Sequence, residues 1–260
     1  MATITVYRTA TIPATADTDT LRFTDGSIAV TAGLDLSALT EGLTKCVIAR
    51  QWTADIGSTA SPFLTDVDAG TGIFINNSGG GTLYYKPTGD NNLCLKYIHN
   101  GFGSAVMTGG TFTKMEVANG KVVVGSSCVI TNLDISGGQV FLQGNAGTAP
   151  TLVRVFGGAF STERATTTLT MSGGTSTLNA TSAATTINVY GGTVNIQRSG
   201  TITAFNLFSG NALNFNIGTG ITVTDSTFSS KVPGAADLSH NEAITYTNAT
   251  TWLFGDGKNY

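Results

Sequence analysis

A repeat with a period of about 18 residues constrains this chain more than any other feature of its sequence. Each copy has two apolar residues at alternate positions, then Gly-Gly or a related pair, then a further apolar residue. Copies begin at Met115, Leu133, Val153, Leu169, Ile187, Phe205 and Ile221, and those at Leu133, Val153 and Ile187 match fully. Helical repeats are much longer, whereas one turn of a β-solenoid has about this length.

Strand geometry and glycine conformation explain the pattern. Successive side chains of a strand point to opposite sides, so Ile187 and Val189 are expected to face a core and Asn188 the solvent. Gly-Gly supplies the corner, because glycine adopts the positive φ of a tight bend. Further irregular turns are expected upstream, around residues 73–75 and 93–97. The sequence therefore predicts an all-β fold, a parallel β-solenoid (β-helix) of about seven to nine rungs of about 18 residues, with irregular N- and C-terminal caps.

The extent of the repeat divides the chain into three regions. Residues 1–60 are expected to form a β-rich N-terminal attachment and capping region, residues 61–230 the solenoid, and residues 231–260 a C-terminal cap with an aromatic cluster. Caps are expected because the end rungs of a solenoid leave strand edges unpaired and the core open. Within the first region, residues 34–43 are compatible with one short helix.

Equivalent outward positions of the repeats are expected to form a column along the solenoid. Its members are Glu116, Asp134, Arg154, Thr170, Asn188, Asn206 and Thr222. Neighbouring Asn side chains on stacked strands form amide ladders, so Asn188 and Asn206 are expected to hydrogen-bond to each other. This is a structural feature and not a ligand site.

Charge and hydropathy argue against two classes of partner. The formal net charge is −3 and only 11% of residues are charged, without the clustered Lys and Arg that phosphate binding needs, so no nucleic-acid partner is expected. The apolar runs are far shorter than the roughly 18 residues of a membrane span, and no membrane partner is expected. Residues 1–6 alternate in polarity and lack a basic start and long apolar segment, which predicts no signal peptide.

Residues with metal or redox chemistry are few and scattered. Cys46, Cys94 and Cys128 have no CxxC spacing and are expected to be small buried apolar residues. His99 and His240 lack a supporting catalytic or metal-binding motif. Residues 66–70 resemble the opening of a calcium loop, but Thr71 and Asn77 stand where that loop requires Gly and Glu. We therefore expect neither a metal nor a cofactor.

One pair of carboxylates deserves comparison with the catalytic pair of glycoside hydrolases. Glu116 and Asp134 occupy equivalent positions of consecutive repeats, and such enzymes use two carboxyl groups roughly 5 to 10 Å apart. The next position holds Arg154, and no row of aromatic residues accompanies the pair. The sequence favours an exposed charged pair on a solenoid wall, and the chain is not expected to be an enzyme.

Residues 14–39 resemble the opening of tailed-bacteriophage virion structural proteins. The resemblance lies in an early Ala-Asp-Thr stretch, a Gly-x-apolar-x-apolar strand and the motif Gly33-Leu34-Asp35-Leu36-Ser37, followed by Gly-rich β repeats. It implies a capsid decoration (cement) protein that binds the major capsid protein and stabilises the head. The family type further implies a homotrimer on the exterior of the virion, made in the host cytoplasm.

Several apolar and aromatic residues are candidates for the docking surface of such a protein. They are Leu34, Leu36, Trp52, Tyr246, Trp252, Phe254 and Tyr260. Trp and Tyr are favoured interface anchors, although the C-terminal aromatic residues could instead form a cap packed on the last rung. The main alternative function is a tail fibre or tailspike segment that binds a host surface glycan, and the next alternative is a carbohydrate-active enzyme.

Overall fold

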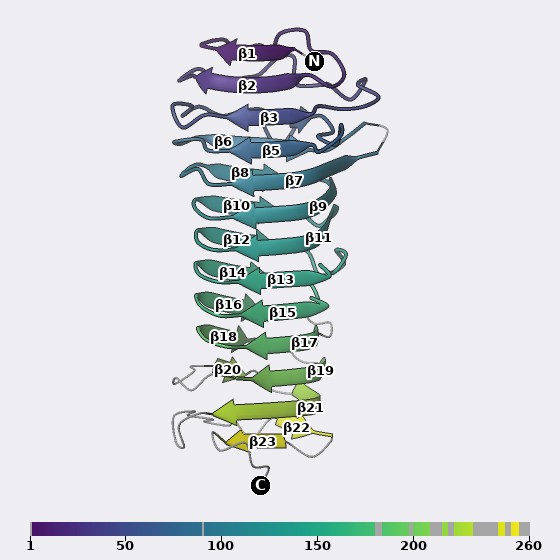
Figure 1. Cartoon of the computed structure of the whole chain (residues 1–260), viewed down its shortest axis with the longest axis vertical. Helices are drawn as coiled ribbons and strands as arrows, with labels where there is room; N and C mark the ends of the chain where they lie inside the picture. The colour runs from purple at the N-terminus through teal and green to yellow at the C-terminus, as the bar shows by residue number, and fades with distance from the viewer. Residues whose placement is uncertain are drawn as a thin grey trace. The chain divides into compact units, whose positions relative to one another are not determined.

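The computed structural model describes residues 2–89, 91–179, 184–197, 200–208, 215–217, 221–230, 244–247 and 251–254. These residues form two parallel β-sheets and no helix, as Figure 1 shows. The fold is a β-solenoid of about 11 turns of about 18 residues, which confirms the predicted fold class. The predicted seven to nine rungs were too few.

Contacts between residues divide the chain into two compact units. Unit 1 comprises Met1–Leu133 with Gly138–Phe141, and unit 2 comprises Asp134–Gly137 with Leu142–Tyr260. The strands of unit 1 are β1 (Thr3–Tyr7), β2 (Thr20–Asp25), β3 (Lys45–Ile48), β4 (Phe63–Leu64), β5 (Ile73–Asn76), β6 (Thr82–Lys86), β7 (Leu93–His99), β8 (Ser104–Met107), β9 (Gly110–Val117) and β10 (Lys121–Val124). Residues of β11 (Cys128–Ile135) and β12 (Gln139–Leu142) belong to both units.

Most strands of unit 2 alternate between the two sheets. The strands of this unit are β13 (Leu152–Val155), β14 (Ala159–Thr162), β15 (Thr168–Met171), β16 (Thr175–Leu178), β17 (Ala184–Val189), β18 (Thr193–Ile196), β19 (Gly200–Leu207), β20 (Phe215–Ile217), β21 (Ile221–Ser230), β22 (Ile244–Tyr246) and β23 (Thr251–Phe254). One sheet takes β13, β15, β17, β19 and β21 in that order, and the other takes β14, β16, β18 and β20. Each rung from β13 to β20 thus contributes one strand to each sheet, whereas β22 and β23 both pair with β21 in the first sheet.

Unit 1 has an aromatic core. Its first sheet runs β1-β2-β3-β5-β7-β9 and its second β4-β6-β8-β10. The fully buried rings between them are Phe23, Trp52, Phe63, Phe74, Tyr85, Tyr97 and Phe112. The Phe74 ring lies 4.7 Å from that of Tyr85 and 5.4 Å from that of Tyr97, centroid to centroid. Such contacts stabilise by about 0.5–1.5 kcal/mol each beyond the apolar area they bury.

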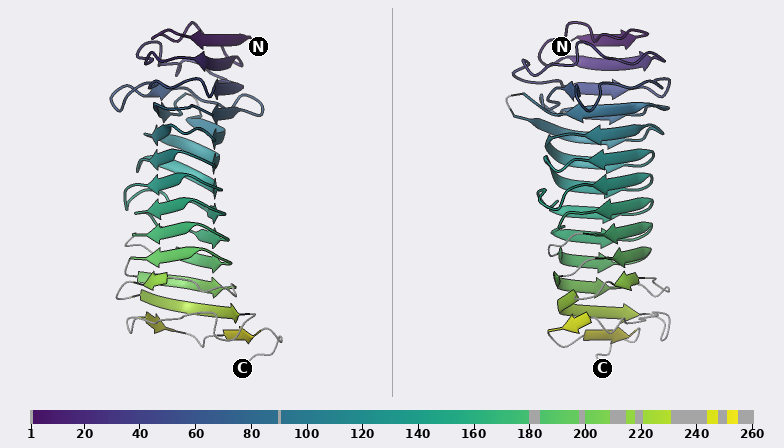
Figure 2. Two further views of the ribbon diagram at one scale, coloured as in Figure 1. Left: turned by 90° about the vertical axis from the view of Figure 1, so that its left-hand side faces the viewer. Right: turned by 180° about the vertical axis from the view of Figure 1, so that it is seen from behind.

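Long loops in unit 1 explain why the sequence underestimated the number of rungs. Phe74 pairs with Cys46 on one side and with Tyr97 on the other, and both partners lie more than 20 residues away. The loops that flank β3 and β5 project well beyond the strands in Figure 2. A search at a fixed period near 18 residues does not detect rungs of this length.

The N-terminal residues belong to the same parallel ladder. β1 pairs with β2, β2 with β3, and β3 with β5, so pairing continues across the predicted boundary at residue 60. Val6, Leu21 and Phe23 are completely buried. Residues 1–60 therefore build the first rungs of the core of unit 1.

Residues 34–43 form turns and not the short helix that the sequence allowed. The Asp35 carboxylate accepts hydrogen bonds from the Ser37 amide at 3.0 Å and from its hydroxyl at 2.5 Å. Asp and Ser compete in this way with helical hydrogen bonding. Leu34 and Leu36 exchange backbone hydrogen bonds with Leu64, which joins the segment to the sheet instead.

Unit 2 follows the predicted alternation closely. Ile187 and Val189 are buried while Asn188 is partly exposed, as expected. The same alternation holds along β13, β15 and β19. The register corrects the last copy of the repeat, because Phe205 pairs with Ser226 and not with Ile221, and Asn206 pairs with Thr227. Thr222 therefore pairs with Thr201 and lies outside the predicted outward column.

The second glycine of each Gly-Gly corner is the one that the fold requires. Gly158 and Gly174 have φ values of 74° and 73°, a conformation that side chains disfavour. A Cβ on Gly174 would also lie 2.5 Å from the Gly158 carbonyl oxygen of the preceding rung. A side chain at this corner position would therefore clash with the backbone of the preceding rung.

Candidate functional site

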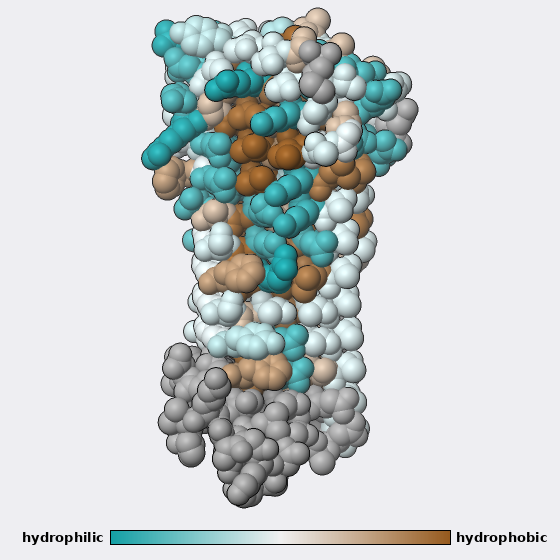
Figure 3. Space-filling model, in the orientation of Figure 1, coloured by the Kyte–Doolittle hydropathy of each residue, from teal (hydrophilic) through white to brown (hydrophobic). Residues whose placement is uncertain are grey.

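The outward side of the first sheet of unit 1 combines apolar and basic side chains. One column of paired residues runs Arg22, Val47, Ile75, Ile98 and Glu116, and the next runs Lys45, Ile73, Lys96 and Lys114. All are exposed or partly exposed. We call these nine residues the unit 1 face. In Figure 3 the face appears as a brown patch with teal around it.

The charges of the unit 1 face are unevenly paired. Glu116 forms ion pairs with Lys96 at 3.1 Å and with Lys114 at 2.5 Å. Burial raises the pKa of Glu116, but the hydrogen bonds from the two ammonium groups outweigh it and the pKa is lowered. Among the described residues no ion pair is recorded for Arg22 or Lys45, which are exposed. The face therefore has four cations and one carboxylate in a chain of net charge −3.

Neither member of the carboxylate pair is arranged as a general acid. Glu116 belongs to unit 1 and has a lowered pKa, whereas a glycosidase acid needs a raised one. Asp134 belongs to unit 2 and accepts two hydrogen bonds from the Arg154 guanidinium, at 2.6 and 2.7 Å. Each carboxylate is thus neutralised by cations of its own unit.

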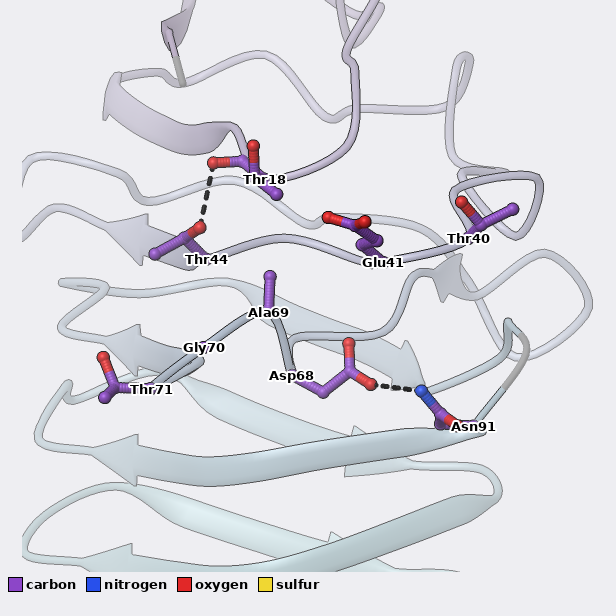
Figure 4. A pocket seen from close by; sticks show the side chains of 9 residues that line it. All are labelled: Thr18, Thr40, Glu41, Thr44, Asp68, Ala69, Gly70, Thr71 and Asn91. Carbon is purple, nitrogen blue, oxygen red and sulfur yellow. Dashed lines mark hydrogen bonds between the residues drawn. The ribbon is translucent and has the colours of Figure 1, made fainter.

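A pocket of about 620 Å³ opens in unit 1, between the loops that precede β2, β3, β5 and β7. Figure 4 shows its lining, which includes Glu41, Asp68 and Asn91. Asn91 donates to one carboxylate oxygen of Asp68 at 2.7 Å, and the other oxygen is buried without a hydrogen-bond partner. The rest of the lining is Thr18, Thr40, Thr44, Ala69, Gly70 and Thr71.

Asp66, from the calcium-like segment, has a structural role beside this pocket. It is 3% exposed and accepts hydrogen bonds from the amides of Leu93 and Asn91, at 3.0 and 3.2 Å. Burial raises its pKa, against the lowering effect of these hydrogen bonds. In the described part of the chain, no three His, Cys, Asp or Glu side chains are placed to hold a metal ion together.

His99 is part of a buried hydrogen-bond chain. Its Nε2 lies 3.2 Å from the Gly103 carbonyl, which only accepts, so Nε2 carries the proton. Its Nδ1 then accepts from the Tyr97 hydroxyl at 3.1 Å, and Asn76 donates to the same hydroxyl oxygen at 3.2 Å. Burial lowers the pKa of His99 to about 4. The imidazole is therefore neutral near pH 7 and inaccessible to a substrate. Cys46, Cys94 and Cys128 are likewise buried, as predicted.

Unit 2 presents a different outer surface, made of hydroxyl and amide groups with exposed aromatic rings beside them. The Asn206 amide donates to Asn188 at 2.9 Å, which confirms the predicted ladder. At the corner after each strand of the first sheet stand Phe156, Ser172, Tyr190 and Phe208, aligned by their backbone hydrogen bonds to the preceding rung. We call the three rings the aromatic column. Phe156 and Tyr190 are 55% and 52% exposed.

None of the residues predicted for docking belongs to the unit 1 face or to the aromatic column. Trp52 is completely buried against Phe23 and donates to the Ala54 carbonyl at 2.9 Å, so it belongs to the core and not to a surface. Leu34 is 7% exposed and Leu36 is partly exposed. Tyr246, Trp252 and Phe254 lie on β22 and β23, whose side chains are not described, and Tyr260 lies outside the described residues, as does His240. Most of the predicted cap at 231–260 also lies outside them.

Sequence reasoning missed the unit 1 face and the aromatic column. The segment Ile73-Phe74-Ile75 has three consecutive apolar residues, of which only Phe74 is buried in the core. Apolar residues on both sides of a strand were the signal for the face. Phe156 and Tyr190 both immediately precede the Gly-Gly pair of their repeats, and this shared position was the signal for the column.

In comparisons with known proteins, no family profile, no curated protein and no solved structure matches this chain. Its described residues include no helix long and apolar enough to cross a membrane.

Proposed function

We propose that this protein is a structural component of a bacteriophage virion, a capsid decoration protein that binds the major capsid protein through unit 1 and stabilises the head. It would lie on the capsid exterior after synthesis in the host cytoplasm, as a homotrimer. The proposal involves no catalytic step and no cofactor.

The observation that carries the proposal is the unit 1 face. Val47, Ile73, Ile75 and Ile98 form an apolar centre beside the unpaired cations Arg22 and Lys45. A patch of apolar residues with a polar rim is typical of a protein interface. The excess of positive charge fits a partner whose surface has carboxylates around an apolar centre, because complementary charge favours encounter and fixes orientation.

The resemblance of residues 14–39 to phage structural proteins supports the same conclusion. The motif at residues 33–37 begins at Gly33, whose φ is 65°, and ends in the turn that Asp35 and Ser37 close. These residues fix the loop that joins β2 to β3, two strands of the unit 1 face. The segment that resembles phage structural proteins therefore connects two strands of the proposed docking surface.

Binding to heads that lack this protein tests the proposal. Wild-type protein is expected to bind such heads at a fixed number of copies per capsomer, measured by co-sedimentation and cryo-electron microscopy. The double variant Arg22→Glu with Lys45→Glu is expected to bind at least tenfold more weakly, because both substitutions reverse charge on the face. The matched control is Lys86→Glu with Lys121→Glu, which changes the charge equally on the second sheet of unit 1.

The microscopy also separates the alternatives. Density repeated over the head supports decoration. Density confined to the tail, with none on the head, overturns it and supports a tail fibre or tailspike segment that binds a host glycan. Equal loss of binding in both double variants would contradict the role of the unit 1 face.

A further inference from the structure

The aromatic column of unit 2 is interrupted by one small residue. Phe156, Ser172, Tyr190 and Phe208 occupy the same corner position on four successive rungs. Ser172 therefore leaves a gap between the rings of Phe156 and Tyr190. We propose that this gap is a binding site for one ring of a neutral glycan, which would be held between the two aromatic side chains.

Rung spacing gives the gap a suitable width. The rings of Tyr190 and Phe208, one rung apart, are stacked with centroids 4.8 Å apart and planes at 17°. This separation equals the spacing of adjacent strands, about 4.8 Å, so residues two rungs apart are about 9.6 Å apart. A ring between two others needs about 3.5–4.0 Å of carbon-to-carbon separation on each side. A pyranose ring therefore fits between Phe156 and Tyr190, whereas the space between Tyr190 and Phe208 is already closed.

The exposure of the rings points to binding and not only to packing. Phe156 and Tyr190 have more than half of their surface exposed. A column that served only for stacking would be continuous, since a ring at position 172 would contact both neighbours. Aromatic rings with exposed surface offer a large apolar contact area that a sugar ring can cover.

The neighbouring side chains define the chemical class of the ligand. Thr170, Asn188 and Asn206 lie on β15, β17 and β19, two positions before the corner residues Ser172, Tyr190 and Phe208. Hydroxyl and amide groups both donate and accept hydrogen bonds, as sugar hydroxyls do. The nearest charges on this column, Asp134 and Arg154, neutralise each other at 2.6 Å. This surface therefore favours a neutral sugar over a uronic or sialic acid.

A glycan array that contains neutral and acidic oligosaccharides tests the proposal, followed by saturation-transfer NMR with each neutral oligosaccharide that binds. The key variant is Ser172→Phe, which fills the gap and extends the stacked column, so that folding is retained. It is expected to weaken binding at least tenfold with an unchanged or higher Tm. Tyr190→Ala is expected to weaken binding similarly. The control is Phe102→Ala, which removes a ring that is 63% exposed in unit 1 and is expected to leave binding unchanged.

Two results would overturn the inference. One is that wild-type protein binds no neutral glycan on the array. The other is that Ser172→Phe, folded to the same Tm, binds as the wild type does. The inference does not depend on the proposed attachment to capsids, because its residues all belong to unit 2 and the readout is a purified protein with purified oligosaccharides.

Discussion

The two units build the same rung from different residues. Unit 1 fills its core with aromatic rings and connects its first strands with long loops, whereas unit 2 fills its core mainly with aliphatic side chains, with Phe160 and Phe205 among them, and has shorter and more regular repeats. Their outer surfaces differ as well. Paired outward positions hold Val47, Ile75 and Ile98 in unit 1, but Thr170, Asn188 and Asn206 in unit 2.

In this solenoid, the pattern of core residues and the chemistry of the outer surface vary independently. Alternation along each strand fixes which residues are buried, and the outward positions remain free to vary. Unit 1 uses that freedom for apolar and basic residues, and unit 2 uses it for hydroxyl and amide groups. This difference in surface chemistry is the basis on which we propose attachment through unit 1 and ligand contact through unit 2.

The largest expected effects on folding stability come from substitutions in the two cores. Phe74→Ala should destabilise the protein by about 3–5 kcal/mol, because the cavity would remove contacts to several rings. Leu169→Ala, at a completely buried position of unit 2, should cost about 2–3 kcal/mol, because a smaller side chain is removed. Urea denaturation monitored by circular dichroism measures both values. A larger loss of stability for Leu169→Ala than for Phe74→Ala would contradict the greater contribution of the aromatic core.

Lowering the pH should reduce the folding stability of unit 1 through His99. Its pKa is about 4 in the folded protein and 6.5 ordinarily, so between these values only the unfolded chain takes up the proton. Folding stability should fall as the pH drops from 6.5 to 4, by about 3 kcal/mol in total, and no further loss from this group follows below pH 4. Hydrogen exchange at several pH values should show the loss in β5 and β7. His99→Gln should reduce this slope, and an unchanged slope would refute the assignment.

Replacing a corner glycine tests how much the close stacking of corners in unit 2 limits the residue at that position. Gly174→Ala should destabilise by about 2–3 kcal/mol, because it combines a positive φ with a backbone clash. The matched control is Gly70→Ala in unit 1, where φ is 64° and no atom lies within 4 Å of the added Cβ. It should cost about 1 kcal/mol, from backbone strain alone. Thermal unfolding measures both, and equal losses would show that the stacking of corners adds nothing.

The amide ladder should contribute modestly to unit 2. Asn206→Ala removes the 2.9 Å hydrogen bond to Asn188 on a partly exposed surface and should cost about 0.5–1 kcal/mol. A double-mutant cycle with Asn188→Ala isolates the pair by urea denaturation. A coupling energy of zero would show that the hydrogen bond between the two side chains does not stabilise the fold, and that Asn at these positions has another role.

The smallest expected effect belongs to the unit 1 face. Arg22→Glu with Lys45→Glu should change folding stability by less than about 0.5 kcal/mol, because both side chains are exposed. Thermal unfolding measures this directly. A larger destabilisation would show that these cations support the fold, and it would weaken the assignment of the face to docking.

Much of unit 2 was readable from the sequence, because its repeats are nearly constant in length. The burial of Ile187 and Val189, the glycine corners and the Asn188–Asn206 contact were all predicted correctly. The copy at Ile221 was misplaced because a longer connection precedes it, and Ser226 takes the expected position. In unit 1, residues 34–43 do not form the short helix that their sequence allowed, and Trp52, a candidate interface residue, is buried. Local sequence preferences do not show that residues 34 and 36 pair with Leu64, or that the Trp52 ring packs against Phe23.

The parallel β-solenoid follows from the amino-acid sequence alone, because a short period, alternating apolar residues and glycine corners leave few other ways to bury the apolar side chains. Which outward residues lie next to one another becomes known only from the strand register. The register places Val47, Ile75 and Ile98 in one column although more than 20 residues separate each from the next, and it separates Phe156 from Tyr190 by one serine. The physical reason is that loop length carries no periodic signal, whereas strand pairing brings distant residues to within about 5 Å of one another.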